Sequence, residues 1–310
     1  MRAVSVIIAS YNVVPEWFSK AIDSVFSQTY QDFETVVVDS SSDDTVAKIV
    51  EKYGNRIRYH YQDRKGPSAA LNLGIRMSNG KYIAFVDADD VWLPKKLELQ
   101  VELFEKQPDL GLVYSDLYTI DAKGRIFGLV SKLGLDSTHK LEQLFVAGTL
   151  ITKSTVMARR DCLESLGCFD ETMLACEDYD MWLRVAARFK LGYIDIPLAK
   201  WRSHKGNWSL SKENWDYELV LTDKMLKLYP HLEPLKNKRL GRIYHGYGMH
   251  YFHNKSYCSA RRYFKRAIQY EYHCLRSYVF LLCSWFIGAK IVSIFWVLRK
   301  LIQVRSRIHG

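Results

Sequence analysis

Residues 4–9 are Val4-Ser5-Val6-Ile7-Ile8-Ala9, and polar Ser10-Tyr11-Asn12 follow at once. A short run of mostly β-branched apolar residues is typical of a strand buried on both faces of a parallel sheet. Similar runs occur at 33–38, 56–61 and 82–86, separated by helical apolar spacing at 15–28, 45–53 and 68–78. This alternation predicts βαβ units and therefore an α/β protein with a Rossmann-like sheet. Farther along, we predict a strand at 111–115 and helices at 140–146, 161–166 and 178–189.

Three of the predicted strands end in polar residues, at 10–12, at 39–44 and at 87–90. In open parallel sheets, ligands bind beyond the carboxyl ends of the strands, so these segments predict a binding site. The motif G-x-G-x-x-G follows none of these strands, which argues against a dinucleotide cofactor.

The strongest chemical signal is Asp87-Ala88-Asp89-Asp90, at the end of the fourth predicted strand. Three carboxylates this close repel one another unless a cation lies among them. Mg²⁺ is typically held by one or two carboxylates together with substrate phosphates, and such a metal neutralises charge on a departing diphosphate. The alternative is an acidic loop that caps the next helix, for which Pro94 is a suitable start.

Two other acidic segments are candidates for the same site. Asp39 follows the second strand and could accept hydrogen bonds from a base or ribose, although the acids before Thr45 also suit a helix cap. The run Glu177-Asp178-Tyr179-Asp180 opens a predicted helix, where acids often only complement the helix dipole. Activation of a hydroxyl needs a carboxylate away from the metal, and this run would supply one. His204 is a candidate ligand or phosphate donor, although a lone histidine is more often structural.

The chain resembles the family-2 glycosyltransferases of the GT-A fold over roughly residues 3–209. The resemblance is carried, in order, by residues 4–12, Ser24-Val25-Phe26-Ser27-Gln28-Thr29-Tyr30, the D-x-S-x-D-x-T run at 39–45, Ala70-Leu71-Asn72-Leu73-Gly74-Ile75, D-x-D-D at 87–90, Gly167-Cys168-Phe169-Asp170-Glu171 and Glu177-Asp178-Tyr179-Asp180-Met181-Trp182-Leu183-Arg184. Each motif is weak alone, but together and in this order they are specific.

The resemblance implies a GT-A, Rossmann-like nucleotide-diphospho-sugar transferase fold and an inverting, metal-dependent hexosyltransferase. It implies that the nucleotide sugar is bound by Ala9, Tyr11, Asn12, Asp39, Asn72, Asp87, Asp89 and Arg202. Asp89, Asp87 and His204 would hold Mg²⁺ or Mn²⁺. Asp178 would be the general base that deprotonates the acceptor hydroxyl, with Glu177 as its neighbouring helper.

Two departures from the family pattern lie where the nucleotide is expected. Ser40 stands where glycine is common and Leu71 where many members have arginine. These departures leave the base of the nucleotide open, and a UDP-sugar is the donor that the resemblance implies. The Q-x-x-R-W element and the multi-span membrane region of processive synthases are absent from the sequence, so transfer of one sugar to each acceptor is expected.

The net charge of +10 is unevenly distributed along the chain. Residues 236–310 hold 15 Lys and Arg against one acid, Glu271, whereas residues 1–235 have a net charge of −4. We predict a catalytic domain over 1–235 and a helical, basic tail over 236–310, with a helical hairpin at 241–272. From Lys290 onward the pattern predicts an amphipathic helix on an anionic membrane surface. A membrane-spanning segment at 278–298 and a helix packed on the tail itself remain alternatives.

These features predict an enzyme of the cytoplasmic membrane face that acts on a lipid-linked glycan or polysaccharide precursor. The six dispersed cysteines and the short apolar run at the N-terminus favour a cytosolic location. The competing hypothesis is a catalytically degenerate GT-A fold that docks a partner through its tail. No recognised nucleic-acid-binding module is evident in the tail, so nucleic acid is not an expected partner.

Overall fold

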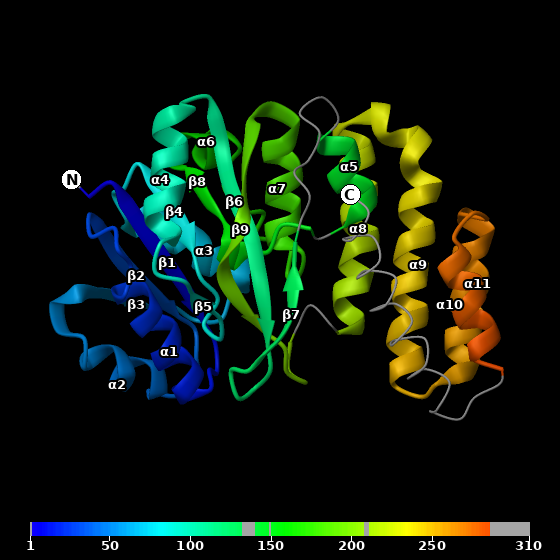
Figure 1. The fold of residues 1–310 in the computed structure, drawn as a ribbon, viewed down its shortest axis with the longest axis horizontal. Helices are drawn as coiled ribbons and strands as arrows, with labels where there is room; N and C mark the ends of the chain where they lie inside the picture. The colour runs from blue at the N-terminus through cyan, green and yellow to red at the C-terminus, as the bar shows by residue number, and fades with distance from the viewer. Residues whose placement is uncertain (1, 132–139, 149, 208–210, 286–310) are drawn as a thin grey trace, which may run out of the picture. The chain divides into compact units, whose positions relative to one another are not determined.

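The computed structural model describes residues 2–131, 140–148, 150–207 and 211–285, which divide into two compact units, Met1–Ser209 and Leu210–Gly310. The first unit contains a helix-covered sheet, and the second is helical (Figure 1). The boundary precedes the one predicted at 235, because helix α8 (Lys212–Leu228) packs on α9 (Lys236–His253) within the second unit. A change in charge composition marks α9 but gives no information about what α8 packs against.

Four parallel strands form the half of the sheet predicted from the sequence. Strand β1 (Val4–Ser10) lies between β2 (Phe33–Asp39) and β4 (Tyr82–Phe85), and β3 (Ile57–Tyr61) pairs with β2. The register pairs Ser10 with Asp39 and Ile7 with Phe85. The polar segments after β1, β2 and β4 therefore leave the sheet at one edge, and the α/β prediction is confirmed.

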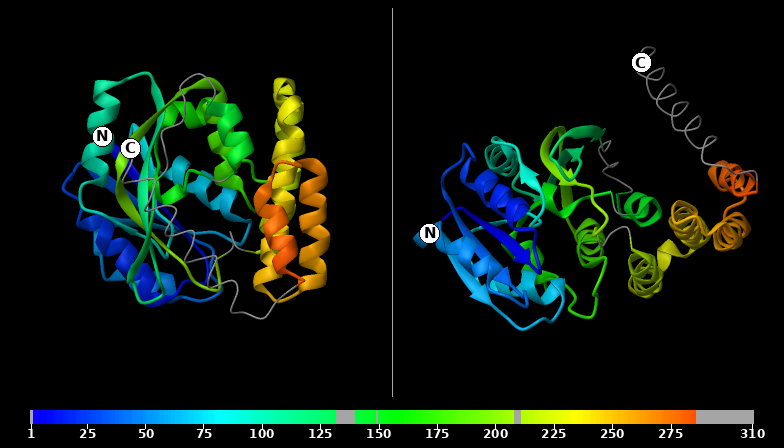
Figure 2. Two further views of the ribbon diagram at one scale, coloured as in Figure 1. Left: turned by 45° about the vertical axis from the view of Figure 1, so that its right-hand side comes forward. Right: turned by 90° about the horizontal axis from the view of Figure 1, so that it is seen from below.

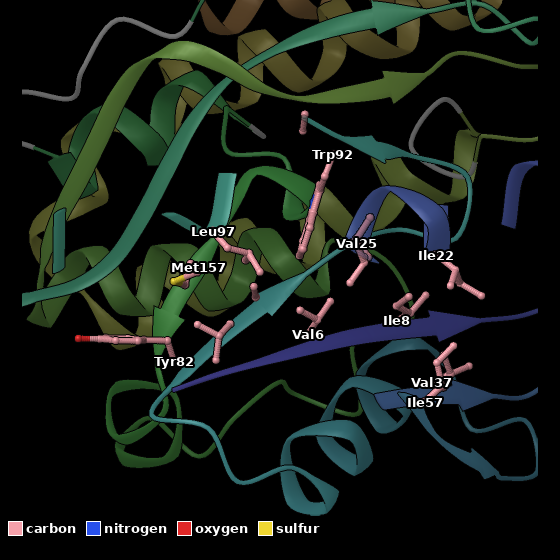
Figure 3. Packing of buried hydrophobic residues seen from close by; sticks show 14 of the residues in the cluster. Val6, Ile8, Ile22, Val25, Val37, Ile57, Tyr82, Trp92, Leu97 and Met157 are labelled. Carbon is pink, nitrogen blue, oxygen red and sulfur yellow. The ribbon is translucent and has the colours of Figure 1, made fainter. Parts of the chain in front are cut away.

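Helices cover both faces of this parallel half. Helices α1 (Pro15–Phe26), α2 (Thr45–Glu51) and α4 (Lys96–Lys106) pack with alternate residues of β1 in one core, part of which is drawn in Figure 3. Helix α3 (Pro67–Met77) lies against the opposite face, so close that a Cβ at Gly74 would be 2.6 Å from Cγ2 of Ile7. Helix α7 (Glu177–Arg188) follows on this face, where Trp182 contacts the ring of Phe85.

The other half of the sheet mixes strand directions. Strand β8 (Met157–Arg159) is antiparallel to β4 and to β6 (Leu110–Ile120), and β9 (Lys190–Arg202) runs parallel to β6. Two-residue β5 (Val91–Trp92) pairs with β9, and β7 (Ile126–Val130) forms a hairpin with β6. These pairings bring the segments before β8 and at the end of β9 to the loop that follows β4.

Short elements complete the first unit. Helices α5 (Lys140–Ala147) and α6 (Arg160–Ser165) and the start of α7 confirm the helices predicted at 140–146, 161–166 and 178–189. Single 3₁₀ turns lie at η1 (Gly54–Arg56) and η2 (Lys153–Thr155). The strand predicted at 111–115 extends to Ile120 as β6.

In the second unit, α8, η4 (Pro230–Leu235), α9, α10 (Tyr257–Tyr270) and α11 (Leu275–Cys283) follow in order, with neighbouring helices side by side (Figure 2). Helices α9 and α10 are the predicted helical hairpin. A buried ion pair joins Arg239 of α9 to Glu218 of α8 at 2.6 Å. The amphipathic helix predicted from Lys290 onward lies outside the described residues. Within those residues, no helix combines the length and apolar character needed to cross a bilayer.

Candidate active site

The acidic loop after β4 is anchored by its last carboxylate. Asp90 is fully buried, and it accepts hydrogen bonds from Ser154 Oγ at 2.6 Å and from the backbone N–H of Arg202 at 2.9 Å. Burial, and next the negative charges of Asp89 and Asp87, raise the pKa of Asp90 well above its ordinary value. Asp90 therefore fixes the loop, and the carboxylates of Asp87 and Asp89 are the partly exposed ones.

Asp89 is paired with His204, which follows β9. Its Oδ2 lies 2.8 Å from Nε2 of His204, while Nδ1 of the same ring accepts the backbone N–H of Gly206 at 3.1 Å. The neutral ring in this arrangement carries its proton on Nε2, so coordination of a metal through Nε2 requires the other tautomer. Burial and the charge of Asp87 raise the pKa of Asp89, and His204 opposes this shift.

The three residues predicted as metal ligands do not form a single cluster. Among the described residues, no group of three or more His, Cys, Asp and Glu side chains is arranged to hold a metal. Asp89 and His204 lie together, but the carboxylate of Asp87 turns to Lys153, whose Nζ is 3.0 Å from Oδ1. A hard carboxylate donor with a nitrogen beside it still fits a divalent cation whose remaining ligands come from a substrate.

Lys153, in the 3₁₀ turn η2, joins the two acidic segments. Its Nζ lies 3.0 Å from Asp87 and 3.1 Å from Oε1 of Glu177, and its side chain is 12% exposed. Burial opposes its charge, but Asp87 and Glu177 outweigh burial and raise the pKa of Lys153 well above its ordinary value. The charged ammonium thus connects segments that are 90 residues apart in the sequence.

Glu177 and Asp178 lie at the first turn of α7. The residue before them, Cys176, has a φ of 58°, a left-handed conformation that is uncommon for a side-chain-bearing residue and turns the chain sharply into the helix. Burial first, and then the charge of Glu177, raise the pKa of Asp178 to about 7, while Lys153 lowers it. Asp178 therefore titrates near neutral pH, where a carboxylate can act as a general base.

Asp180, two residues farther, has a structural role. Its Oδ2 accepts from Nε and Nη2 of Arg184 at 2.9 and 2.6 Å. Arg184 also donates to the backbone carbonyls of Leu166 and Cys168, which ties α7 to the segment before it.

The predicted nucleotide-binding residues of β1 and β2 meet at the same edge. Ala9 lies in β1 opposite Val38, and Tyr11 is 44% exposed with its hydroxyl accepting from Arg64 at 2.8 Å. Asn12 binds the loop after β2, since its backbone N–H donates to Ser41 Oγ at 2.9 Å.

Asp39 is fully buried and is bound by protein groups on both carboxylate oxygens. Oδ1 accepts from the backbone N–H of Ser41 at 2.9 Å and Oδ2 accepts from the hydroxyl of Tyr59 at 2.9 Å. Asp39 therefore shapes the loop after β2.

Two predicted substrate-binding residues, Asn72 and Arg202, make hydrogen bonds that hold the framework of the site. The side-chain amide of Asn72 donates to Phe169 O at 2.8 Å and accepts from Phe169 N at 2.9 Å, so it joins α3 to the segment before α7. Arg202 is 1% exposed and donates through Nε to Asp89 O at 2.7 Å and through Nη1 to Asp121 O at 3.2 Å. It braces the backbone of the acidic loop.

Lys153, Ser154 and Trp17 belong to this site and were not predicted. Ser154 binds Asp90 and the backbone of Asp87, and the ring of Trp17 lies 4.7 Å from that of His204. The local sequence around each gives no signal of a site, because Lys153 and Ser154 reach the acidic loop through the antiparallel pairing of β8 with β4, and β9 brings His204 to Trp17 of α1.

Comparisons with known proteins establish the family of the chain. Residues 5–166, just over half of the chain, match the profile of Glycosyl transferase family 2. An uncharacterized glycosyltransferase of Rickettsia felis is 34% identical over 205 residues, which are 66% of this chain and 33% of that protein. The chain thus spans about a third of that relative's length.

A second relative has a stated activity. The Escherichia coli protein WfgD, a UDP-Glc:alpha-D-GlcNAc-diphosphoundecaprenol beta-1,3-glucosyltransferase, is 29% identical over 67% of this chain and 84% of its own. Among solved structures, residues 1–349 of Staphylococcus aureus TarS in complex with UDP-GlcNAc match with a TM-score of 0.64 and 18% identity, covering 87% of this chain and 81% of that one. The mixed sheet is thus the GT-A fold, as expected, and the chain belongs to glycosyl transferase family 2.

Proposed function

We propose that the chain transfers a single sugar from a nucleotide-diphosphate sugar to an acceptor hydroxyl, with inversion at the anomeric carbon. The observation that carries the proposal is that Lys153 joins the acidic loop after β4 to the acids that open α7. An acidic loop beside a carboxylate that titrates near pH 7 is suited to base-assisted displacement of a diphosphate.

In this reaction Asp178 takes the proton of the acceptor hydroxyl, and the hydroxyl oxygen attacks the anomeric carbon. The bond between that carbon and the diphosphate oxygen breaks, and its electron pair departs with the nucleoside diphosphate. Attack opposite the leaving group inverts the configuration. Glu177, fixed by Lys153, is the second carboxylate beside the base.

Asp89 would hold Mg²⁺ or Mn²⁺ together with the diphosphate of the donor, with His204 beside it. When bound, the metal neutralises the charge that develops on the departing diphosphate. Arg202 keeps the loop in position through the carbonyl of Asp89.

The nucleotide would lie along the edge formed by Ala9, Tyr11, Asn12 and Asp39. Tyr11 offers an exposed ring on which a base can stack, and the guanidinium of Arg64 lies 4.3 Å from the centre of that ring. The names of WfgD and the TarS complex both contain a uridine diphosphate sugar, which favours a UDP-sugar for this chain.

The acceptor would be a glycan linked to a membrane lipid, as in the name of WfgD. In the second unit, Leu275, Tyr278, Leu282 and Trp285 are exposed and recur at helical spacing on α11 and just past its end. We call these four residues the α11 face. An apolar stripe of this kind near exposed cations such as Arg276 suits an anionic membrane surface, and the enzyme would work at the cytoplasmic side of the cell membrane.

The test is an assay of the full-length chain with a panel of UDP-, GDP- and dTDP-sugars, a lipid-diphosphate-linked GlcNAc acceptor, and Mg²⁺, Mn²⁺ or EDTA. We expect nucleotide release and a new glycosidic bond of inverted configuration, with Asp178→Asn as the matched inactive control. If donors bind but none is turned over with any acceptor, the chain is a binding module and the proposal is wrong.

A further inference from the structure

Lys153 occupies a site built by its neighbours. The next residue, Ser154, bonds Asp90 through its hydroxyl and accepts from Nε1 of Trp92 through its carbonyl at 2.8 Å. The carbonyl of Thr155 accepts from Nε2 of buried Gln100 at 2.8 Å. Both residues that follow Lys153 in η2 are thus held by the core and by the acidic loop, so the position of the lysine is fixed.

The ammonium compensates an excess of negative charge. Asp87, Glu177 and Asp178 come from two separate elements, and Lys153 has direct ion pairs with the first two. The side chains of Lys153 and Glu177 are 12% and 11% exposed, so water screens this interaction far less than it screens a surface ion pair.

We propose that Lys153 is a positioning residue, whose ammonium holds Glu177 against the acidic loop and keeps the neighbouring Asp178 ionised as the base. This inference rests on the proposed function and deepens it. Lys153 acts on Asp178 through charge and through Glu177, and it takes no part in bond formation.

Besides burial, four groups act on the pKa of Asp178. Glu177 on the same helix and Asp87 on the acidic loop raise its pKa, whereas Lys153 on η2 and the backbone N–H of Tyr179 lower it. Removal of Lys153 therefore leaves two like charges opposed mainly by one hydrogen bond. The pKa of Asp178 should rise above its present value of about 7, and less of the base is ionised at neutral pH.

The experiment compares Lys153→Met and Lys153→Arg with Lys190→Met, which removes an exposed ion pair with Asp109 in the same unit. An opposite charge close to a carboxylate typically lowers the pKa of that carboxylate by about one unit or more. We expect the acidic limb of kcat/KM for Lys153→Met to move to higher pH by about one unit, with roughly fivefold less activity at pH 7, where the wild-type base is about half ionised, and recovery near pH 9. The Lys153→Arg and Lys190→Met variants should retain the wild-type profile, and calorimetric donor affinity should stay within a few-fold.

A second measurement does not depend on turnover. Titration of ¹³Cγ-labelled aspartates by NMR, with the Asp178 signal identified by its loss in Asp178→Asn, should give a higher pKa in Lys153→Met than in wild type. If wild type transfers no sugar, the proposed function fails, while this titration still decides the role of Lys153.

Three results would overturn the inference: a loss of activity equal at every pH, a loss explained by donor affinity alone, or an unchanged pKa of Asp178. Thermal unfolding establishes whether each variant is folded. If Lys153→Met does not fold, Lys153→Gln keeps a hydrogen-bond donor to Glu177 and carries the same prediction.

Discussion

At the scale of single residues, the proposed base is Asp178, whose pKa is raised to about 7 by burial and by the charge of Glu177. Asp178→Asn keeps the side-chain shape but removes the proton acceptor, and a positioned base typically contributes about 10²–10⁴-fold. We expect kcat to fall by that factor while calorimetric donor affinity survives. Since only the ionised form accepts a proton, wild-type kcat/KM should fall tenfold per pH unit below about pH 7. A flat profile down to pH 5 would assign the base to another group.

Asp178 should also lower the stability of the folded protein at neutral and higher pH. Because its folded-state pKa of about 7 lies above the ordinary value of 3.8, the native state binds more protons than the unfolded chain, and stability falls as pH rises from about 4 to 7. Asp178→Asn should therefore raise Tm at pH 8, by about 2–4 °C for each kcal/mol of stability gained. The difference from wild type should vanish near pH 4. Equal Tm values at both pH values would contradict the raised pKa.

Asp89 is the residue through which metal dependence is expected. Asp89→Ala removes the carboxylate beside His204, and we expect loss of Mg²⁺- or Mn²⁺-stimulated transfer with the protein still folded. Far-ultraviolet circular dichroism checks the fold, and transfer is measured with and without EDTA. Full wild-type activity in EDTA would remove the metal from the proposed mechanism.

At the scale of helices and strands, the sequence predicts those elements that have a clear local hydrophobic pattern and that pack in the fold against elements close to them in the sequence. Buried parallel strands such as β1 have a continuous apolar pattern, and βαβ connections make sequence neighbours into spatial ones. Strands β7, β8 and β9 have no such local signal, and they reach their places through long-range pairing. The position of Lys153 depends on the pairing of β8 with β4. The acids of this site could therefore be predicted from the sequence, whereas the lysine that pairs with them could not.

Substitution of Asn72 distinguishes its contact between α3 and Phe169 from the nucleotide-binding role that the family resemblance implies. Asn72→Ala would leave the buried backbone N–H and C=O of Phe169 without their partner on α3. Loss of such hydrogen bonds costs about 1–3 kcal/mol. We expect a lower free energy of unfolding in urea, with KM for the donor changed only a few-fold. A large rise in KM at unchanged stability would restore Asn72 to the nucleotide-binding set.

The whole molecule combines a net charge of −4 over residues 1–235 with one of +14 over 236–310, and the α11 face lies in the basic part. Each cation near an anionic leaflet contributes about 1 kcal/mol, an attraction that salt screens, whereas burial of apolar side chains in lipid is not screened. We therefore expect the full-length chain to sediment with phosphatidylglycerol vesicles, and high salt to release only part of it.

Substitutions can separate the contribution of the α11 face to vesicle binding from the contribution of the basic residues. Leu282→Glu combined with Trp285→Glu changes two exposed side chains, so the fold should be kept while vesicle binding and transfer to lipid-linked acceptors decline together. Val220→Glu on α8 is the matched control, since Val220 is 54% exposed in the same unit but lies off this face. Donor hydrolysis should be unchanged in both, because neither variant alters the first unit. If the double variant binds vesicles like wild type, or if wild type ignores them, membrane recruitment by this face is wrong and the face packs against another protein surface.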